Sequence, residues 1–166
     1  MNEQLMSFQI GDRVMHWVYG LGEIVEIEEK VLAGRTGEYY VVRIRDLTLW
    51  VPLEDSGEHC LRFLTPASDF QGLFQILASP GELLPEDRLL RKSQLTASLK
   101  GRTLETTCQV IRDLVSYQQT KRLNQNDNSV LTRARNTLLD EWSSALSIPI
   151  KEAERELKSL LETSVV

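Results

Sequence analysis

The first 64 residues alternate apolar and polar side chains with the two-residue period of β-strands. Glycine-containing segments and a tight turn near Asp46 separate the apolar runs. The predicted strands cover residues 13–18, 22–29, 38–45 and 47–52. Short antiparallel strands joined by glycine turns, with no helix between them, are typical of a small β-barrel.

The fourth predicted strand carries a tryptophan on the face opposite its aliphatic side chains. Leu47, Leu49 and Val51 alternate with Thr48 and Trp50. If the aliphatic face is the core, Trp50 faces outward. An exposed indole is a candidate binding anchor, because it buries a large area at low entropic cost. The alternative is that a later helix of the same chain covers Trp50.

From residue 68 onward the apolar positions recur at the spacing of helices. The first helix is predicted to begin with a capping box at Ser68–Gln71 and to stop at Pro80-Gly81. Four more are expected at residues 85–100, at about 103–121, from about 128, and after 149. Their apolar stripes can close a helical bundle, with Trp142 in its core.

The composition is that of a soluble globular protein, with 166 residues, 42% of them hydrophobic and 26% charged. No apolar run approaches the roughly 20 residues that cross a bilayer, and the first residues lack the features of a secretion signal. We therefore expect a cytoplasmic protein without a membrane partner. The predicted class is α+β, with a barrel domain at 1–66, a linking helix and linker at 67–84, and an all-α helical domain at 85–166.

Charge is distributed unevenly along the chain. Residues 1–75 carry 6 Lys and Arg against 12 Asp and Glu, a net charge of −6, whereas residues 88–135 carry 10 against 3, a net charge of +7. Residues 136–166 return to 3 against 6. This pattern suggests two modules with different partners, because a local positive field attracts phosphate even in an acidic chain. The alternative is that the basic residues only solvate a helical surface.

Candidate catalytic and metal-binding groups are sparse. The two cysteines, Cys60 and Cys108, are too far apart for a zinc site, and we expect both to be buried as small hydrophobic residues. His59 and Cys60 are adjacent, so in a strand they would point to opposite faces and could not form a base and nucleophile pair. A phosphate-binding loop of the Walker type is also absent. We therefore expect that the protein is not an enzyme and that it binds no cofactor, no metal and no small-molecule substrate.

An ordered series of short motifs runs through the front module. It comprises Phe8–Val14, Gly20-Leu21-Gly22, Ile27–Lys30 leading to Ala33-Gly34, Tyr39–Ile44 and Val51-Pro52. In this order the motifs resemble those of the CarD family and of the related module in transcription-repair coupling factors. The helical part is similar too, in Gln109–Leu114, in Leu131 with Ala134-Arg135, and in the Ala145–Pro149 turn. The resemblance covers nearly the whole chain.

The resemblance implies a Tudor-like small barrel that docks on the β subunit of RNA polymerase, and a helical domain that contacts promoter DNA near the upstream edge of the transcription bubble. The polymerase contact in the family is a strand surface, which falls here on Lys30 and Trp50, and we add Arg43 and Thr48 to it. Family members often carry a basic residue at the position of Trp50. Tryptophan could keep the contact through packing or stacking instead of charge.

On the DNA side the sequence departs from the family. Where members carry a tryptophan wedge, this chain has Asp87 or Arg88, and an expected basic pair is replaced by Asn128 and Ser129. The remaining candidates for phosphate contact are Arg88, Arg91, Lys92, Arg102, Lys121, Arg122, Arg133 and Arg135. They favour at most weak, sequence-independent DNA contact. The alternative function is a protein-interaction adaptor that uses the same barrel and binds no DNA.

Overall fold

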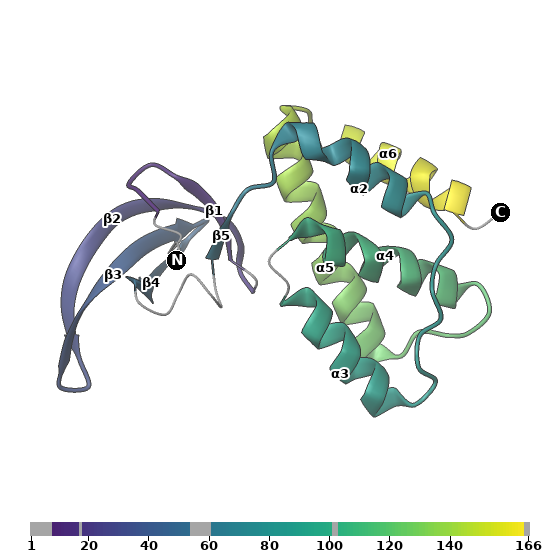
Figure 1. Cartoon of the computed structure of the whole chain (residues 1–166), viewed down its shortest axis with the longest axis horizontal. Coiled ribbons are helices and arrows are strands. Elements are labelled where there is room, and N and C mark those ends of the chain that lie inside the picture. The colour runs from purple at the N-terminus through teal and green to yellow at the C-terminus, as the bar shows by residue number, and fades with distance from the viewer. Residues whose placement is uncertain (1–7, 17, 54–60, 101–102, 165–166) are drawn as a thin grey trace, which may run out of the picture. The chain divides into compact units, whose positions relative to one another are not determined.

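The computed structural model describes residues 8–16, 18–53, 61–100 and 103–164 (Figure 1). The chain divides into two compact units, Met1–Leu64 and Thr65–Val166. The first contains strands and the second contains helices. The predicted α+β class, with a sheet followed by a helical bundle, is confirmed.

The first unit is a five-stranded antiparallel sheet. Its strands are β1 (Arg13–His16), β2 (Gly20–Leu32), β3 (Arg35–Ile44), β4 (Leu47–Pro52) and β5 (Leu61–Phe63), in the order β4-β3-β2-β1-β5. Figure 1 shows β2 and β3 as a long, curved hairpin. The sheet is barrel-like but open, because none of the pairings between described strands joins β4 to β5.

Of the three aliphatic residues that alternation placed on the inner face of the fourth strand, Val51 is buried in the core of the sheet, Leu49 is partly buried against it, and Leu47 is 45% exposed. The buried residues are Phe8, Val14, Ile24, Tyr40, Val42, Ile44, Val51 and Leu61. Gly22 pairs with Val14 where a side chain has no room, since an added Cβ would lie 2.5 Å from Ile44 Cγ1 and 2.9 Å from the Arg43 carbonyl oxygen. A bulge between Ile24 and Glu26 then shifts the register of β2 against β3.

His16 stabilises the turn between β1 and β2. Its Nδ1 accepts hydrogen bonds from the backbone N–H groups of Val18, at 3.0 Å, and of Tyr19, at 3.2 Å. The imidazole ring also lies 5.1 Å from the Tyr19 ring. Burial lowers the pKa of His16 below its ordinary value, so the ring is neutral at neutral pH and Nδ1 is able to accept.

In its described residues, the second unit packs five α-helices around one core. They are α2 (Phe70–Leu77, preceded by the 3-10 turn Ala67–Asp69), α3 (Arg88–Leu99), α4 (Leu104–Gln118), α5 (Gln125–Leu146) and α6 (Ile150–Ser164). Trp142 is fully buried at the centre, with its ring 4.8 Å from Phe74 and 6.4 Å from Phe70. The helix predicted as a linking element, α2, therefore contributes to this core.

The starts of α2 and α5 differ from their predictions. The capping box predicted at Ser68 is wrong: no side chain caps this start, because Ser68 lies inside the 3-10 turn Ala67–Asp69 and not at an N-cap position. A capping box instead begins α5, where Asn124 and Asp127 exchange side-chain to backbone hydrogen bonds of 2.7 and 3.0 Å. That helix starts three residues before the predicted position of 128.

The segment of residues 79–87, between α2 and α3, is fixed along α4. Arg112 donates to Ser79 Oγ at 3.0 Å, and the Glu82 amide donates to Asp113 Oδ1 at 2.9 Å. Gly81 lies so close to Ser116 that an added Cβ would be 2.6 Å from the serine Cβ. The segment expected to be a linker therefore belongs to the packed helical unit.

Candidate functional site

Trp50 lies on the outer face of the sheet, opposite the core side chain of Val51, and 42% of its surface is exposed. Its indole reaches across β3 to β2. Nε1 donates to Glu28 Oε1 at 3.1 Å, and Lys30 Nζ lies 4.0 Å from the ring centroid. The outward orientation predicted by strand alternation is thus present.

These two contacts hold an exposed aromatic ring in one position. A cation–π contact at such an exposed site contributes about 0.5–1 kcal/mol of interaction free energy. The hydrogen bond from Nε1 limits rotation of the indole about its side-chain bonds. A side chain that is ordered before binding loses less conformational entropy when a partner covers it. The arrangement of Trp50, Glu28 and Lys30 is therefore suited to protein recognition.

Arg43 and Thr48 extend this surface along the edge of the sheet. They are directly opposite each other in the β3–β4 ladder, and both are exposed. The two-residue period places Arg43 on the face of Val41 and Thr48 on the face of Trp50, and Val41 pairs with Trp50. All four residues of the predicted polymerase surface, Lys30, Arg43, Thr48 and Trp50, thus share one face beside the edge strand β4.

Glu28 was not predicted as part of this surface. It stands two residues before Lys30 on β2, so alternation alone puts the two side chains on one face. What the sequence did not reveal is their alignment with Trp50, because the bulge at Ile24/Glu26 moves the register after the strand begins.

Arg91 does not lie on a DNA-contacting surface, and its assignment to the phosphate-binding set is corrected. Only 3% of the residue is exposed. Its Nε and Nη2 donate to the two carboxylate oxygens of Asp127, each at 3.0 Å, and Nη1 donates to the carbonyls of Pro85 and Glu86 at 2.9 and 3.2 Å. The hydrogen bonds with Asp127 raise the pKa of this guanidinium above its ordinary value.

Arg91 also explains where α3 begins. Because its guanidinium binds the carbonyl oxygens of Pro85 and Glu86, these two residues precede the helix instead of forming its predicted first turn. Arg91 further lies 5.0 Å from the ring of Tyr117 on α4. One buried side chain thus joins α3, α4, α5 and the end of the 79–87 segment.

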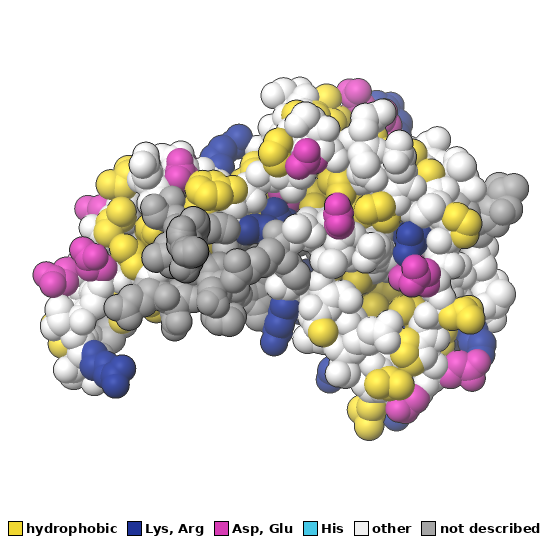
Figure 2. All heavy atoms as spheres, viewed as in Figure 1, with side chains coloured by type: hydrophobic (Ala, Val, Ile, Leu, Met, Phe, Trp, Pro, Cys, Tyr) yellow, Lys and Arg dark blue, Asp and Glu magenta, His cyan; other side chains and the backbone are white. Residues whose placement is uncertain are grey.

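The other predicted DNA contacts differ in exposure and pairing. Arg88, Lys92, Arg122 and Arg133 are exposed, Lys121 pairs with Glu86 at 3.1 Å, Arg135 is half-buried, and Arg102 lies outside the described residues. On the face of the helical unit that Figure 2 displays, basic side chains are mixed with acidic and hydrophobic ones. The face displayed there shows no continuous basic patch on the helical unit.

Asn128 and Ser129, which replace the basic pair expected from the family, line a shallow polar hollow on α5. Its volume is about 650 Å³, and it also contains the exposed Arg133. The Asn128 side chain donates to the Asn124 carbonyl oxygen at 3.1 Å. This surface presents amides and hydroxyls with one cation, so it offers hydrogen bonds more than positive charge.

The sequence also did not predict three exposed leucines around the start of α3. Leu83 is 98% exposed, Leu89 75% and Leu90 55%. The buried residues of α3 are Arg91 and Leu95, and Leu89 and Leu90 lie off the face that these two define. A period count would have placed them in the core, since apolar residues usually mark the buried face.

The described residues offer few candidate nucleophiles or metal ligands. Burial, followed by the nearby charges of Glu141 and Glu105, raises the pKa of the Cys108 thiol to about 12, so it stays protonated at neutral pH. Its prediction as a buried residue is confirmed, whereas Cys60 and His59 lie outside the described residues. The described ranges hold no cluster of three metal-ligating side chains. They also contain no helix long and apolar enough to span a membrane.

Comparison with known proteins agrees with the two-unit architecture. Residues 8–64 match the CarD-like/TRCF RID domain, and residues 72–158 match the CarD C-terminal domain. The chain is also 30% identical over 160 residues to a Bacillus subtilis (strain 168) protein named "Putative transcription factor YdeB", with 92% of this chain and 98% of that protein covered. The chain therefore belongs to the CarD family, whose members regulate transcription through interaction with RNA polymerase.

Proposed function

We propose that this protein regulates transcription by docking the outer face of its sheet on the β subunit of RNA polymerase. The contact residues are Lys30, Arg43, Thr48 and Trp50. The observation that carries the proposal is Trp50, which is 42% exposed yet held in place by Glu28 and Lys30. Such a fixed aromatic anchor beside a cation is the usual composition of an interface hot spot.

The edge position of β4 adds a second element to the contact. An edge strand presents backbone N–H and C=O groups that an extended segment of a partner can pair with, while side chains on alternate positions supply specificity. Thr48 and Trp50 are two such alternate positions. The proposed partner therefore contributes a strand along β4 and a concave surface for the indole.

Replacing Trp50 by alanine tests this function. We expect Trp50→Ala to weaken binding of the purified polymerase β subunit at least about tenfold, because the variant removes the central apolar contact. Titration of a labelled β fragment with full-length protein measures the affinity. Val31→Ala is a matched control, since Val31 is 66% exposed but lies on the opposite face of the hairpin.

Two outcomes would contradict the proposal. The first is that the wild-type protein does not bind RNA polymerase or its β subunit. The second is that Trp50→Ala binds as tightly as Val31→Ala. Circular dichroism of both variants checks that the sheet is intact, which is expected because Trp50 lies outside the core cluster of the unit.

We further propose that the helical unit contacts promoter DNA weakly and without sequence preference. The residues are the exposed cations Arg88, Lys92, Lys121, Arg122 and Arg133, with Arg102 as a further candidate. Support comes from the net positive charge of residues 88–135, and the mixed surface and the Lys121–Glu86 pair limit the expected strength. Chemistry on a substrate forms no part of this function, which is exercised in the cytoplasm.

Salt dependence measures the DNA contact. If about four of these cations touch phosphate, the logarithm of the binding constant for duplex DNA falls with the logarithm of salt concentration with a slope of about −3 to −4. Fluorescence anisotropy of a labelled duplex gives this slope. The combined variant Arg88→Gln/Lys92→Gln should reduce its magnitude by about 2, whereas Lys151→Gln on α6 should not change it. Salt-independent binding, or none, would leave only the protein-docking role.

A further inference from the structure

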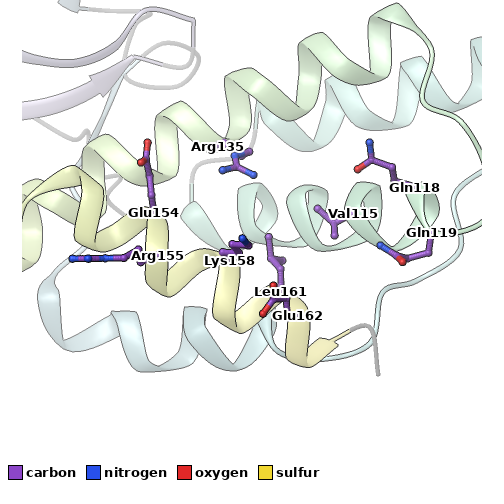
Figure 3. A pocket seen from close by; sticks show the side chains of 9 residues that line it. All are labelled: Val115, Gln118, Gln119, Arg135, Glu154, Arg155, Lys158, Leu161 and Glu162. Atoms are coloured by element: carbon purple, nitrogen blue, oxygen red, sulfur yellow. The ribbon is translucent and has the colours of Figure 1, made fainter.

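A recess on the helical unit lies among α4, α5 and α6. Its volume is about 580 Å³, which falls in the range of small-molecule sites. Figure 3 shows the side chains around it: Arg135 comes from α5, Lys158 and Leu161 from α6, and Val115 and Gln118 from α4. The nine lining residues comprise three cations, two carboxylates, two amides and two aliphatic side chains.

Arg135 is the unusual member of this set. Three arginines in the described part of the helical unit are not fully exposed, and two of them have a carboxylate partner. Arg91 pairs with Asp127 at 3.0 Å and Arg112 with Asp113 at 2.9 Å. The third, Arg135, has no ion pair or hydrogen bond with any side chain of the described residues. A partly desolvated guanidinium without an anionic partner is free to bind an anion from solution.

The direction of the charged side chains indicates what the recess could hold. In Figure 3 Arg135 and Lys158 both extend into the space between the helices, whereas Arg155 points away from it. Glu154 and Glu162 also line the recess. Two carboxylates repel an extended polyanion such as duplex DNA, so the recess favours a compact oxyanion that contacts Arg135 and Lys158.

We propose that this recess binds a small molecule that carries a phosphate or carboxylate group. The oxyanion pairs with Arg135 and Lys158, Val115 and Leu161 contact an apolar part of the molecule, and Gln118 hydrogen-bonds a polar part. Arg135 consequently serves this site and not the DNA surface. The ligand is bound without being chemically altered, and it stabilises the helical unit by mass action.

The test uses the full-length protein with inorganic pyrophosphate and citrate as probes, titrated calorimetrically at constant ionic strength. The two probes separate phosphate from carboxylate as the preferred oxyanion. We expect saturable binding of at least one probe, weakened at least about tenfold by Arg135→Gln and by Lys158→Gln. Arg133→Gln is the matched control, because it removes the same charge from an exposed position two residues away on the same helix.

Binding of neither probe, or equal weakening by Arg133→Gln and Arg135→Gln, would overturn the proposal, because charge alone would then account for any affinity. If Arg135→Gln does not fold, the exposed Lys158→Gln decides the matter alone. The titration contains no polymerase and no DNA. Its failure is therefore distinguishable from failure of the docking proposal.

Discussion

Replacing Arg91 by alanine is expected to lower the free energy of unfolding of the helical unit by about 3–5 kcal/mol. The substitution leaves the Asp127 carboxylate, which is 1% exposed, buried without its cation. It also removes both hydrogen bonds to the carbonyls of Pro85 and Glu86. The loss is large because an unpaired buried charge costs more than the ion pair itself contributes.

Urea denaturation followed by far-ultraviolet circular dichroism measures this effect, because the helical signal reports on the second unit even if the sheet unfolds separately. Lys92→Ala is the control, and we expect it to stay within about 0.5 kcal/mol of wild type, since Lys92 is exposed on the next position of α3. The double variant Arg91→Ala/Asp127→Ala should lose less stability than the sum of the losses in the two single variants. A loss below about 1 kcal/mol in Arg91→Ala would show that the pair is not structurally important.

Replacing Trp142 by alanine is expected to destabilise the same unit by about 3–5 kcal/mol. The indole is fully buried between α2 and α5, where it contacts the rings of Phe70 and Phe74. Alanine leaves a cavity bordered by two aromatic rings that the surrounding helices cannot fill without repacking. The loss of this packing should also destabilise α2, because the buried face of α2 contacts the Trp142 ring.

Trp142→Phe provides the comparison for this variant. The Trp142 Nε1 is buried and has no hydrogen-bond partner among the described residues. Phenylalanine therefore removes an unsatisfied polar group along with some volume, and we expect less than half the loss seen for alanine. Urea denaturation by circular dichroism is again the measurement. Equal losses for the two variants would mean that ring packing contributes little.

Patterns within one element predicted the local structure well. The alternation from Leu47 to Val51 was enough to place Trp50 on the outer face of the sheet, because the β3–β4 ladder has no register shift that would exchange its faces. β5 was not predicted, since three residues are too few to establish a period. The sequence also did not predict that Glu28 and Lys30 contact Trp50, because this alignment depends on the register of β2 after its bulge.

Contacts between segments that are distant in the chain could not be predicted from the sequence. The spacing of Arg88, Arg91 and Lys92 suggested one basic helix face, yet Arg91 is buried by a carboxylate 36 residues away. No helical period relates positions so far apart. The capping boxes illustrate the same limit: Ser68 and Asn124 both begin plausible motifs, and only the backbone before each helix decided which one formed.

The fixed position of residues 79–87 has a consequence for how the two units can act together. Since α2 and this segment belong to the helical unit, the connection between β5 and the 3-10 turn is reduced to Leu64, Thr65 and Pro66. Three residues span at most about 10 Å. When the sheet is bound, so short a tether keeps the helical unit at a high effective concentration near the same target. Weak contacts made by that unit then gain occupancy without any increase in their own affinity.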